Sequence, residues 1–298
     1  MRFFLYKIFL FILLNKSITS WRNILDNKKL NSVNNNDSQC IISSKNNNIY
    51  CDNEAKLFIT NNDFLLNKKL ITISPGGFKG FYLLGILTYI KENYDMDNYI
   101  YSGASAGSWN GLFMCYKGEP LDLVYKLIDS NIKKATNILD LEYFMKYKLL
   151  TTYKEKDFDL RRLFIGVTTI KNFKTATNIF SDFENLEDAI NCCIASSHIP
   201  LITGGITNKY HNMFTFDGGF SRYPYLENEN LVLHISHNMW NKIVVKPKNS
   251  IKKTIEIIKN FSEFFSITNK NFLELFDDGY QDAKKHKKYF DLLFRHKN

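Results

Sequence analysis

Cysteine is scarce in this chain, which limits the covalent and metal-based supports that the fold can have. Five cysteines occur among 298 residues, and the odd number argues against a dense disulfide framework. Cys40 and Cys51 could pair if their segment enters an oxidising compartment, whereas Cys192 and Cys193 lie in an apolar stretch and are expected in the core. Because no cysteine spacing suits zinc and no carboxylate cluster suggests calcium, the sequence predicts neither a metal nor another cofactor.

Signatures of nucleic-acid binding are absent as well, although the chain is basic. Lysine and arginine outnumber aspartate and glutamate by 39 to 30, which gives a net charge of +9. Such a charge favours anionic partners, either nucleic acid or an anionic lipid surface. The basic residues are scattered and match no nucleic-acid-binding motif, so we expect no nucleic-acid partner. Nothing in the sequence indicates an oligomeric state.

The apolar stretch at the N-terminus is too short to span a bilayer comfortably as a helix. It covers Phe3–Leu14, is interrupted by Lys7 and is followed by polar residues up to Ser20. This arrangement resembles a secretory signal peptide, and an uncleaved interfacial anchor is the alternative. We therefore expect residues 1–20 to be a signal-like or membrane-anchor segment, and the protein to be secreted or associated with a membrane.

Most of the chain is expected to form one α/β domain. Residues 21–55 are rich in asparagine and are interpreted as a linker, which leaves residues 56–298 for the domain. Within it, short β-branched runs alternate with stretches of helical periodicity, the pattern of a largely parallel sheet covered on both faces. The expected strands are residues 70–74, 99–102, 163–170, 175–180, 231–236 and 242–245; the expected helices are residues 81–93, 121–138, 186–195 (with Asn185 as N-cap), 251–265 and 271–290, and one that begins near Ala106.

A serine motif lies between one of these strands and the helix that follows it. Gly103-Ala104-Ser105-Ala106-Gly107 fits the pattern G-x-S-x-G. A serine on such a tight turn needs small neighbours, because the backbone there is strained and crowded. Its hydroxyl then stands clear of the sheet at the positive end of the helix. The pattern makes Ser105 a candidate nucleophile, and a small-residue turn for close packing is the competing structural explanation.

A glycine-rich turn occupies an earlier strand-to-helix junction. Its sequence is Pro75-Gly76-Gly77-Phe78-Lys79-Gly80. Acyl transfer develops negative charge on a carbonyl oxygen, and backbone N–H groups at a helix N-terminus can stabilise that charge. Gly76, Gly77 and Phe78 are the expected donors because proline has no N–H, and Lys79 would add positive charge. The spacing fits neither the Walker motif nor the dinucleotide-binding fingerprint, which disfavours a phosphate-binding loop.

A third motif, Asp217-Gly218-Gly219, follows an expected strand end at residues 214–216. Asp-Gly is common turn chemistry, so this motif taken alone favours an ordinary turn. However, seven of the fourteen glycines in the chain fall within the three motifs, which indicates that these are special points of the backbone. Burial beside the serine would raise the pKa of Asp217 from an ordinary value of about 3.9 and make it a better base at neutral pH.

The three motifs, in this order, resemble the patatin-like phospholipase family, whose pattern is a Gly-rich loop with a basic residue, then G-x-S-x-G, then Asp-Gly-Gly. The resemblance extends over residues 70–283 and includes Ala195–Pro200, which is similar to the Ala-Ser-x-x-x-Pro segment of the family, and Gly279–Ala283. It implies a three-layer α/β/α fold around a mainly parallel central sheet. Two positions depart from the pattern: Pro75 replaces the first glycine of the loop, and Ser221–Pro224 stands where the family often has an asparagine.

The resemblance also implies roles for individual residues. Ser105 is the nucleophile and Asp217 its base, in a Ser–Asp dyad without histidine. On residue order alone, a Ser–His–Asp arrangement that uses His234 or His237 is the alternative. The expected oxyanion-hole residues are Gly76, Gly77, Phe78 and Lys79, and the remaining motif glycines are Gly80, Gly103, Gly107, Gly218 and Gly219.

Hydrolysis of lipid acyl esters is the function that we expect from these features, through an acyl-serine intermediate resolved by water. Phospholipids are the first expected substrates, at a membrane or lipid-droplet surface, because the net charge and the apolar N-terminus both favour an anionic lipid surface. Two alternatives remain open. One is an acyltransferase that passes the acyl chain to an alcohol; the other is a lipid-binding module that has lost activity, which only Pro75 supports.

Overall fold

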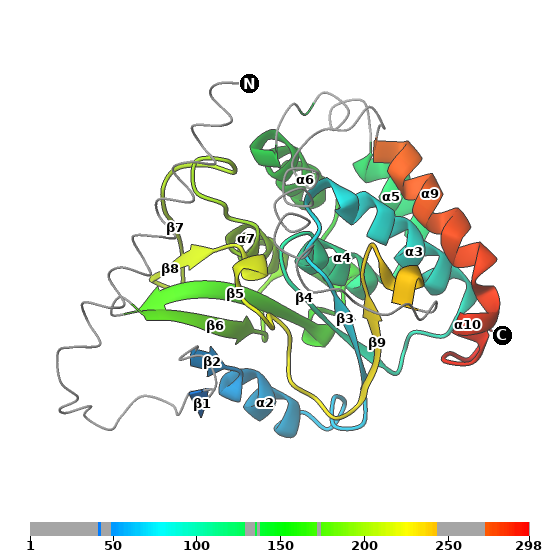
Figure 1. Cartoon of the computed structure of the whole chain (residues 1–298), viewed down its shortest axis with the longest axis horizontal. Coiled ribbons are helices and arrows are strands. Elements are labelled where there is room, and N and C mark those ends of the chain that lie inside the picture. The colour runs from blue at the N-terminus through cyan, green and yellow to red at the C-terminus, as the bar shows by residue number, and fades with distance from the viewer. Residues whose placement is uncertain are drawn as a thin grey trace, which may run out of the picture. The chain divides into compact units, whose positions relative to one another are not determined.

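The computed structural model describes residues 41–42, 49–128, 135, 138–171, 174–242 and 272–297 (Figure 1). All of them belong to one compact unit that begins at Cys40 and extends to the C-terminus. The expected signal-like segment, most of the expected linker, the helix expected over residues 251–265 and nearly all of the strand expected at 242–245 lie outside the described residues. Within the described ranges, no helix is long and apolar enough to cross a membrane.

Among the described residues, nine strands form a sheet at the centre of this unit. Its main path is β1 (Ile41–Ile42), β2 (Ile49–Cys51), β6 (Lys174–Phe180), β5 (Leu163–Lys171), β4 (Tyr99–Gly103), β3 (Lys69–Ile73) and β9 (Leu231–Ile235). The neighbouring strands β5, β4, β3 and β9 are parallel, whereas β6 is antiparallel to β5 and parallel to β2. β8 (Met213–Phe216) pairs antiparallel with β5 and with β7 (Asn208–Tyr210). The expected mainly parallel centre of the sheet is confirmed.

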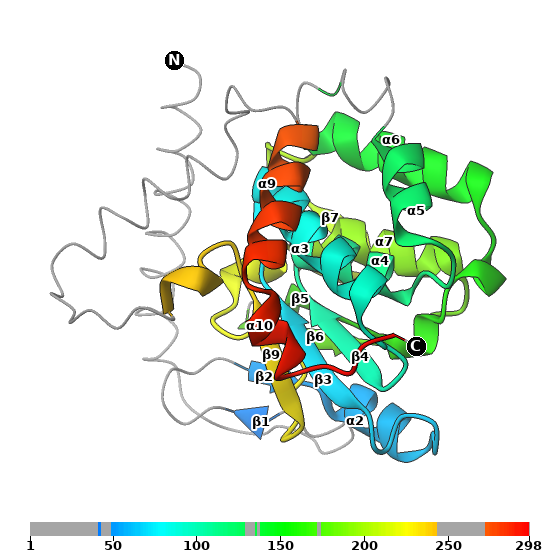
Figure 2. The ribbon, with the colours of Figure 1, turned by 90° about the vertical axis from the view of Figure 1, so that its right-hand side faces the viewer.

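Each face of the sheet has its own apolar layer, because successive side chains of a strand point to opposite faces. Ile71 and Tyr101 belong to the larger core cluster, whereas their chain neighbours Leu70 and Ile100 belong to the smaller one. α3 (Gly80–Asn93), α4 (Ala106–Cys115) and α9 (Phe272–Lys285) pack on the first face, and α2 (Asn53–Thr60) covers the second (Figures 1 and 2). Helices therefore lie on both sides of the sheet, and the three-layer α/β/α fold is confirmed.

Part of the expected linker is regular structure instead. Residues 49–55 contain β2 and the beginning of α2, and β2 pairs in register with β6. Ala55 is fully buried in the smaller core cluster. The asparagine-rich composition did not indicate these contacts, because β2 pairs with β6, which lies more than 120 residues further along the chain. Cys51 is disulfide-bonded, and its expected partner Cys40 lies outside the described residues, whereas Cys115, Cys192 and Cys193 are buried free thiols.

The helix expected over residues 121–138 must also be corrected. α5 (Pro120–Leu127) ends where Ile128 leaves the helical range with ψ 56°, and a separate helix, α6 (Ile138–Thr152), follows. The sequence analysis did not predict α6, because apolar and aromatic residues lie on both of its faces. Leu139, Tyr143 and Tyr147 are exposed, so the buried and exposed faces differ little in hydrophobicity.

The other helices that the structure describes agree more closely with the sequence analysis. α7 (Leu186–Ser196) begins at its expected cap, because the Asn185 side chain accepts a hydrogen bond from Asp188 N at 2.9 Å. The helix expected over residues 271–290 is divided into α9 and the short α10 (Lys287–Asp291). α9 packs along α3, which carries the glycine-rich turn at its N-terminal end.

Candidate active site

Ser105 lies on the sharp turn between the end of β4 and the beginning of α4. Its backbone has φ 52° and ψ −129°, a conformation that costs a residue other than glycine about 1–3 kcal/mol. α4 can begin this close to the sheet because Gly107 has no side chain: a Cβ there would lie 2.1 Å from the carbonyl oxygen of Ile73. The turn predicted from the G-x-S-x-G pattern is therefore present, and Gly103 and Gly107 lie at its crowded points.

Two further serines hold this turn in place. Ser105 N donates a hydrogen bond to Ser196 Oγ at 2.8 Å, and Ser196 Oγ donates one to the carbonyl oxygen of Gly166 at 2.7 Å. The Ser108 hydroxyl donates to the carbonyl oxygen of Ser105 at 2.6 Å. Sequence analysis assigned no role to Ser196, because that role depends on a contact between residues 91 positions apart.

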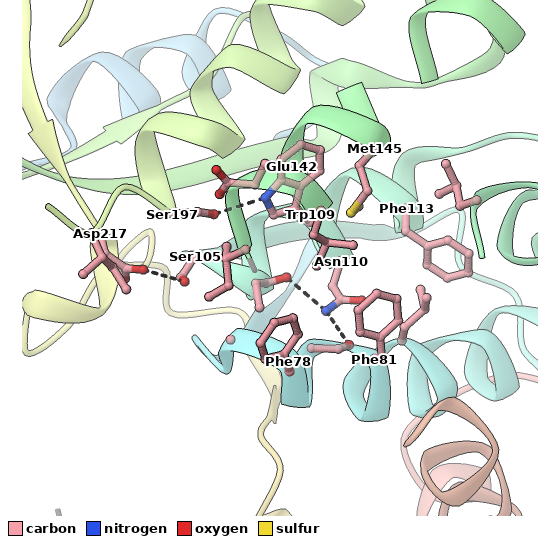
Figure 3. A pocket seen from close by; sticks show the side chains of 18 residues that line it. Phe78, Phe81, Ser105, Trp109, Asn110, Phe113, Glu142, Met145, Ser197 and Asp217 are labelled. Carbon is pink, nitrogen blue, oxygen red and sulfur yellow. Dashed lines mark hydrogen bonds between the residues drawn. The ribbon is translucent and has the colours of Figure 1, made fainter. Parts of the chain in front are cut away.

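Asp217 follows β8 and faces Ser105 from the other side of the turn (Figure 3). Its Oδ2 accepts a hydrogen bond from the Ser105 hydroxyl at 2.7 Å, and its Oδ1 accepts one from Gly219 N at 2.6 Å. Its own N–H donates to the carbonyl oxygen of His198 at 2.7 Å, which fixes the backbone beyond the strand. The structure thus brings two residues from separate motifs into direct contact.

Burial changes the acid–base properties of this pair. Ser105 and Asp217 are each only 6% exposed. Burial raises the pKa of Asp217 to about 6, and the hydrogen bonds from Ser105 and Gly219 oppose this rise because they stabilise the carboxylate. The carboxylate is still ionised at neutral pH, but it is a stronger base than an ordinary aspartate. It can therefore accept the proton of the Ser105 hydroxyl more readily.

The glycine-rich turn supplies backbone N–H groups next to Ser105. Gly77 has φ 50°, in the left-handed region that favours glycine, and Gly77 and Phe78 line the same pocket as Ser105. Within the part of the chain that the structure describes, neither of their N–H groups has a backbone acceptor. Ala106 N, the first N–H of α4, is a third candidate donor that sequence analysis missed, because it also lines the pocket at a helix N-terminus.

Two expected oxyanion-hole residues are placed differently. The Lys79 N–H donates to the carbonyl oxygen of Gly76 at 2.9 Å, so it is not available to a substrate, and the positive charge expected of the Lys79 side chain stays a prediction. Neither Gly76 nor Lys79 lines the pocket, whereas Gly80, which begins α3, does. The short helical turn that Gly77 opens explains this arrangement, because it uses the Lys79 N–H for its own closure.

A mostly apolar pocket opens beside the Ser105 hydroxyl (Figure 3). Its walls come from α3, α4, α5 and α6, and from the turn at Gly77. Asn110 ties two of these walls together, because its Nδ2 donates to the carbonyl oxygens of Gly80 and Ala106 at 3.1 and 3.0 Å. Such a pocket suits an acyl chain, because transfer of its apolar surface from water into an apolar pocket is favourable. The apolar lining includes Phe78, Phe81, Trp109, Phe113, Leu141 and Met145.

The histidines are placed unfavourably for the Ser–His–Asp alternative. A serine hydroxyl has one hydrogen, and that of Ser105 is donated to Asp217. His234 Nδ1 is hydrogen-bonded to Thr72 Oγ1 at 2.9 Å, and burial lowers the pKa of His237. Neither histidine lines the pocket. In the described ranges, no group of three His, Cys, Asp or Glu side chains is placed to hold a metal ion.

Gly77→Ala is expected to lower kcat about 10- to 100-fold with little change in KM. An alanine at φ 50° is strained by about 1 kcal/mol, and relief of that strain would turn the Gly77 and Phe78 N–H groups away from a developing oxyanion. Steady-state kinetics on a soluble ester would separate the two parameters. Gly205→Ala is the matched control, because a Cβ there would meet only Thr207 O, at 4.0 Å. A fall in kcat that is equal in both variants would contradict a role for Gly77.

Comparison with known proteins places these motifs in a family. A family model described as patatin-like phospholipase matches residues 71–227, which is more than half of the chain and contains all three motifs. No curated protein matches the chain. Among solved structures, VipD from Legionella pneumophila matches with a TM-score of 0.39 at 12% sequence identity, over 78% of this chain and 68% of VipD.

Proposed function

This chain belongs to the patatin-like phospholipase family, whose members are generally lipid acyl hydrolases, and from that premise we propose that it cleaves lipid acyl esters through an acyl-enzyme formed on Ser105. The observation that carries the proposal is the hydrogen bond from Ser105 Oγ to Asp217 Oδ2, at 2.7 Å, at one end of an apolar pocket. A nucleophile in contact with a buried base is the arrangement that covalent acyl transfer requires.

In the acylation step, Ser105 Oγ attacks the ester carbonyl carbon while its proton passes to Asp217 Oδ2. The carbonyl oxygen becomes an oxyanion, which the N–H groups of Gly77 and Phe78 are placed to stabilise. The carbonyl then re-forms and the bond to the alcohol breaks. The departing alcohol oxygen takes the proton from Asp217, which leaves an acyl ester on Ser105 and an ionised carboxylate.

Water repeats the same steps in deacylation. Asp217 accepts a proton from the attacking water, and Ser105 Oγ is the leaving group that recovers this proton when the fatty acid is released. A base with a pKa of about 6 suits both directions, because it is ionised before each attack and is acidic enough to return the proton afterwards. No step requires a metal ion or a histidine.

Phospholipids are the substrates that we propose first, at a membrane or lipid-droplet surface. The support is indirect: the pocket beside Ser105 is mostly apolar, and the chain carries a net charge of +9, which favours anionic surfaces. In keeping with that surface, we propose that the protein is secreted or membrane-associated.

A fluorophosphonate probe and a lipid panel test this proposal together. The probe is expected to add to Ser105, where peptide mass spectrometry would locate it, and the enzyme is expected to release fatty acid from mixed phospholipid and neutral-lipid vesicles. Prior incubation with the probe should abolish that release. Transfer of the acyl chain to an added alcohol in preference to water would instead indicate an acyltransferase. Neither labelling nor release by a folded protein would indicate a lipid-binding module.

A further inference from the structure

A loop with two exposed aliphatic side chains borders the active site. It consists of residues 197–207, which connect α7 to β7 and are drawn in yellow-green between these two labels in Figure 1; we call it the rim loop. Leu201 is 37% exposed and Ile206 is 69% exposed. Large apolar side chains that are exposed together in one short segment mark an interaction surface more often than scattered ones do.

The rim loop is joined directly to the catalytic residues. The carbonyl oxygen of His198 accepts the hydrogen bond from Asp217 N, and Ile199 lines the apolar pocket together with Ser105. Only two residues further along the chain, Leu201 is exposed to solvent. The rim loop therefore extends from the wall of the pocket to the outer surface, and whatever binds its exposed side chains lies next to the pocket.

The backbone of the rim loop holds Leu201 in an unusual conformation. Leu201 has φ 65°, in the left-handed region, which is uncommon for a bulky side chain and is adopted more readily by glycine or asparagine. Two hydrogen bonds maintain the turn: Leu201 N donates to the carbonyl oxygen of Gly205 at 3.2 Å, and Ile199 N donates to Thr203 Oγ1 at 2.8 Å. The turn alone thus does not explain a leucine at this position, whereas a binding role for its side chain does.

The charges around the rim loop favour an anionic partner. In residues 199–223, all of which the structure describes, Lys209 and Arg222 are exposed, and the only acidic residue is the buried Asp217. Lys209 Nζ lies 4.9 Å from the centroid of the Phe214 ring, which is itself 42% exposed. Aliphatic side chains with basic groups beside them and no accessible carboxylate complement a phospholipid surface, where acyl chains lie beneath anionic headgroups.

We propose that the rim loop docks the protein on an anionic phospholipid bilayer. Leu201 and Ile206 insert among the acyl chains and Lys209 lies at the headgroups, so that a lipid passes from the bilayer into the pocket beside Ser105. The inference rests on the proposed function, because it takes the bilayer to be the source of the substrate. A bilayer is favoured over a protein partner because the rim loop adjoins the pocket that receives a lipid.

Vesicle binding by the full chain tests the proposal. All variants carry Ser105→Ala so that the lipid is not consumed, and the vesicles contain phosphatidylcholine and phosphatidylglycerol. Leu201→Asn combined with Ile206→Thr is expected to lower the partition coefficient about 10- to 100-fold, because less apolar surface leaves water on docking. Asparagine tolerates the left-handed backbone, so the melting temperature should not fall.

The matched control removes two exposed leucines from other parts of the surface. Leu57 on α2 is 60% exposed, and Leu292, at the end of α10, is 86% exposed. Leu57→Asn combined with Leu292→Thr should leave the partition coefficient unchanged. An unchanged partition coefficient in Leu201→Asn with Ile206→Thr, or an equal fall in both double variants, overturns the proposal.

A second readout reports the position of the rim loop itself, which binding through another part of the chain would not affect. Ile206→Trp places a fluorophore at the exposed position, and lipids brominated on their acyl chains quench a tryptophan that lies among them. The added fluorescence of Ile206→Trp should be quenched on the vesicles, whereas that of Leu57→Trp should not. Absence of quenching at Ile206→Trp in vesicle-bound protein overturns the proposal.

The role of Lys209 and the possibility of a second copy as the partner have their own outcomes. Lys209→Gln is expected to lower the partition coefficient about 3- to 10-fold on anionic vesicles and to leave it unchanged on pure phosphatidylcholine. Equal binding of Lys209→Gln and its parent to anionic vesicles overturns the headgroup assignment. A dimer in analytical ultracentrifugation that is lost in Leu201→Asn with Ile206→Thr, without loss of vesicle binding, would make the rim loop a contact between copies of this chain.

Failure of the inference and failure of the proposed function can be told apart. Vesicle binding through the rim loop, without fatty acid release by the wild type, contradicts only the proposed function. Fatty acid release by the wild type, with vesicle binding that Leu201→Asn and Ile206→Thr do not change, contradicts only the docking role.

Discussion

Ser105→Ala is expected to lower the rate of lipid ester hydrolysis by about a thousandfold to a millionfold. The variant keeps the Cβ atom, so the strained backbone at φ 52° and the hydrogen bond from Ser105 N to Ser196 remain. It loses only the hydroxyl, whose partner is Asp217 Oδ2. Without that oxygen no acyl-enzyme forms, and any residual turnover comes from water held near the oxyanion donors.

Fatty acid release from vesicles, measured alongside circular dichroism and the melting temperature, would test this expectation. The melting temperature should change by only a few degrees, because the hydroxyl makes a single hydrogen bond. Ser181→Ala, at a serine that does not line the pocket, is the matched control and should retain wild-type release. Full activity in a folded Ser105→Ala variant would remove Ser105 from the mechanism and would place the nucleophile elsewhere.

The sequence predicted the parts of the site that are local in the chain. Gly103–Gly107 specifies its own turn, because glycines at both ends permit the close approach of α4 to β3 and the small residues between them fit the crowded backbone. The same holds for the left-handed backbone at Gly77. In each case a few consecutive residues determine the conformation, so their pattern can be read without knowledge of the rest of the fold.

The parts that depend on distant residues could not be predicted in this way. Ser196 supports Ser105 because α7 packs beside α4, and neither helix alone indicates that contact. Glu142 belongs to α6, which the sequence analysis did not predict, and it points inward from a helix whose opposite side carries exposed tyrosines. A glutamate beside the exposed Tyr143 suggests a solvated helix face, and only the packing of α6 against the pocket shows that it is buried.

Asp217→Asn is expected to lower kcat/KM by about a hundredfold to ten-thousandfold, because asparagine cannot accept the proton of Ser105. The change preserves shape: the amide oxygen can still accept from Gly219 N, and the amide nitrogen then faces Ser105 Oγ. The pH dependence of wild-type kcat/KM should carry the signature of the same carboxylate. Activity should be full above pH 7 and fall as the pH decreases through about 6, where Asp217 takes up a proton.

Control variants decide whether the loss of activity in Asp217→Asn comes from disruption of the Ser105–Asp217 dyad. Asp277→Asn, at an exposed aspartate on α9, should keep wild-type activity and the same pH profile. His234→Ala and His237→Ala should each keep most of the activity, because Ser105 donates to Asp217 and not to an imidazole. If Asp217→Asn keeps most activity while one of the histidine variants loses it, the Ser–Asp assignment is wrong and a histidine is the base.

Asp217→Asn is also expected to stabilise the folded protein at neutral pH. Because the pKa of Asp217 is raised from 3.8 to about 6 on folding, the folded state holds this proton more tightly than the unfolded state does. The stability that this proton provides is fully present below pH 4 and is lost as the pH rises through 6, which costs at most about 3 kcal/mol. Asparagine resembles the protonated acid and avoids that cost.

Urea unfolding should therefore show no difference in stability between Asp217→Asn and the wild type near pH 4, and a more stable variant at pH 7. A variant that is less stable at pH 7 would mean that the ionised carboxylate is stabilised where it lies, and the base strength inferred from its burial would have to be abandoned.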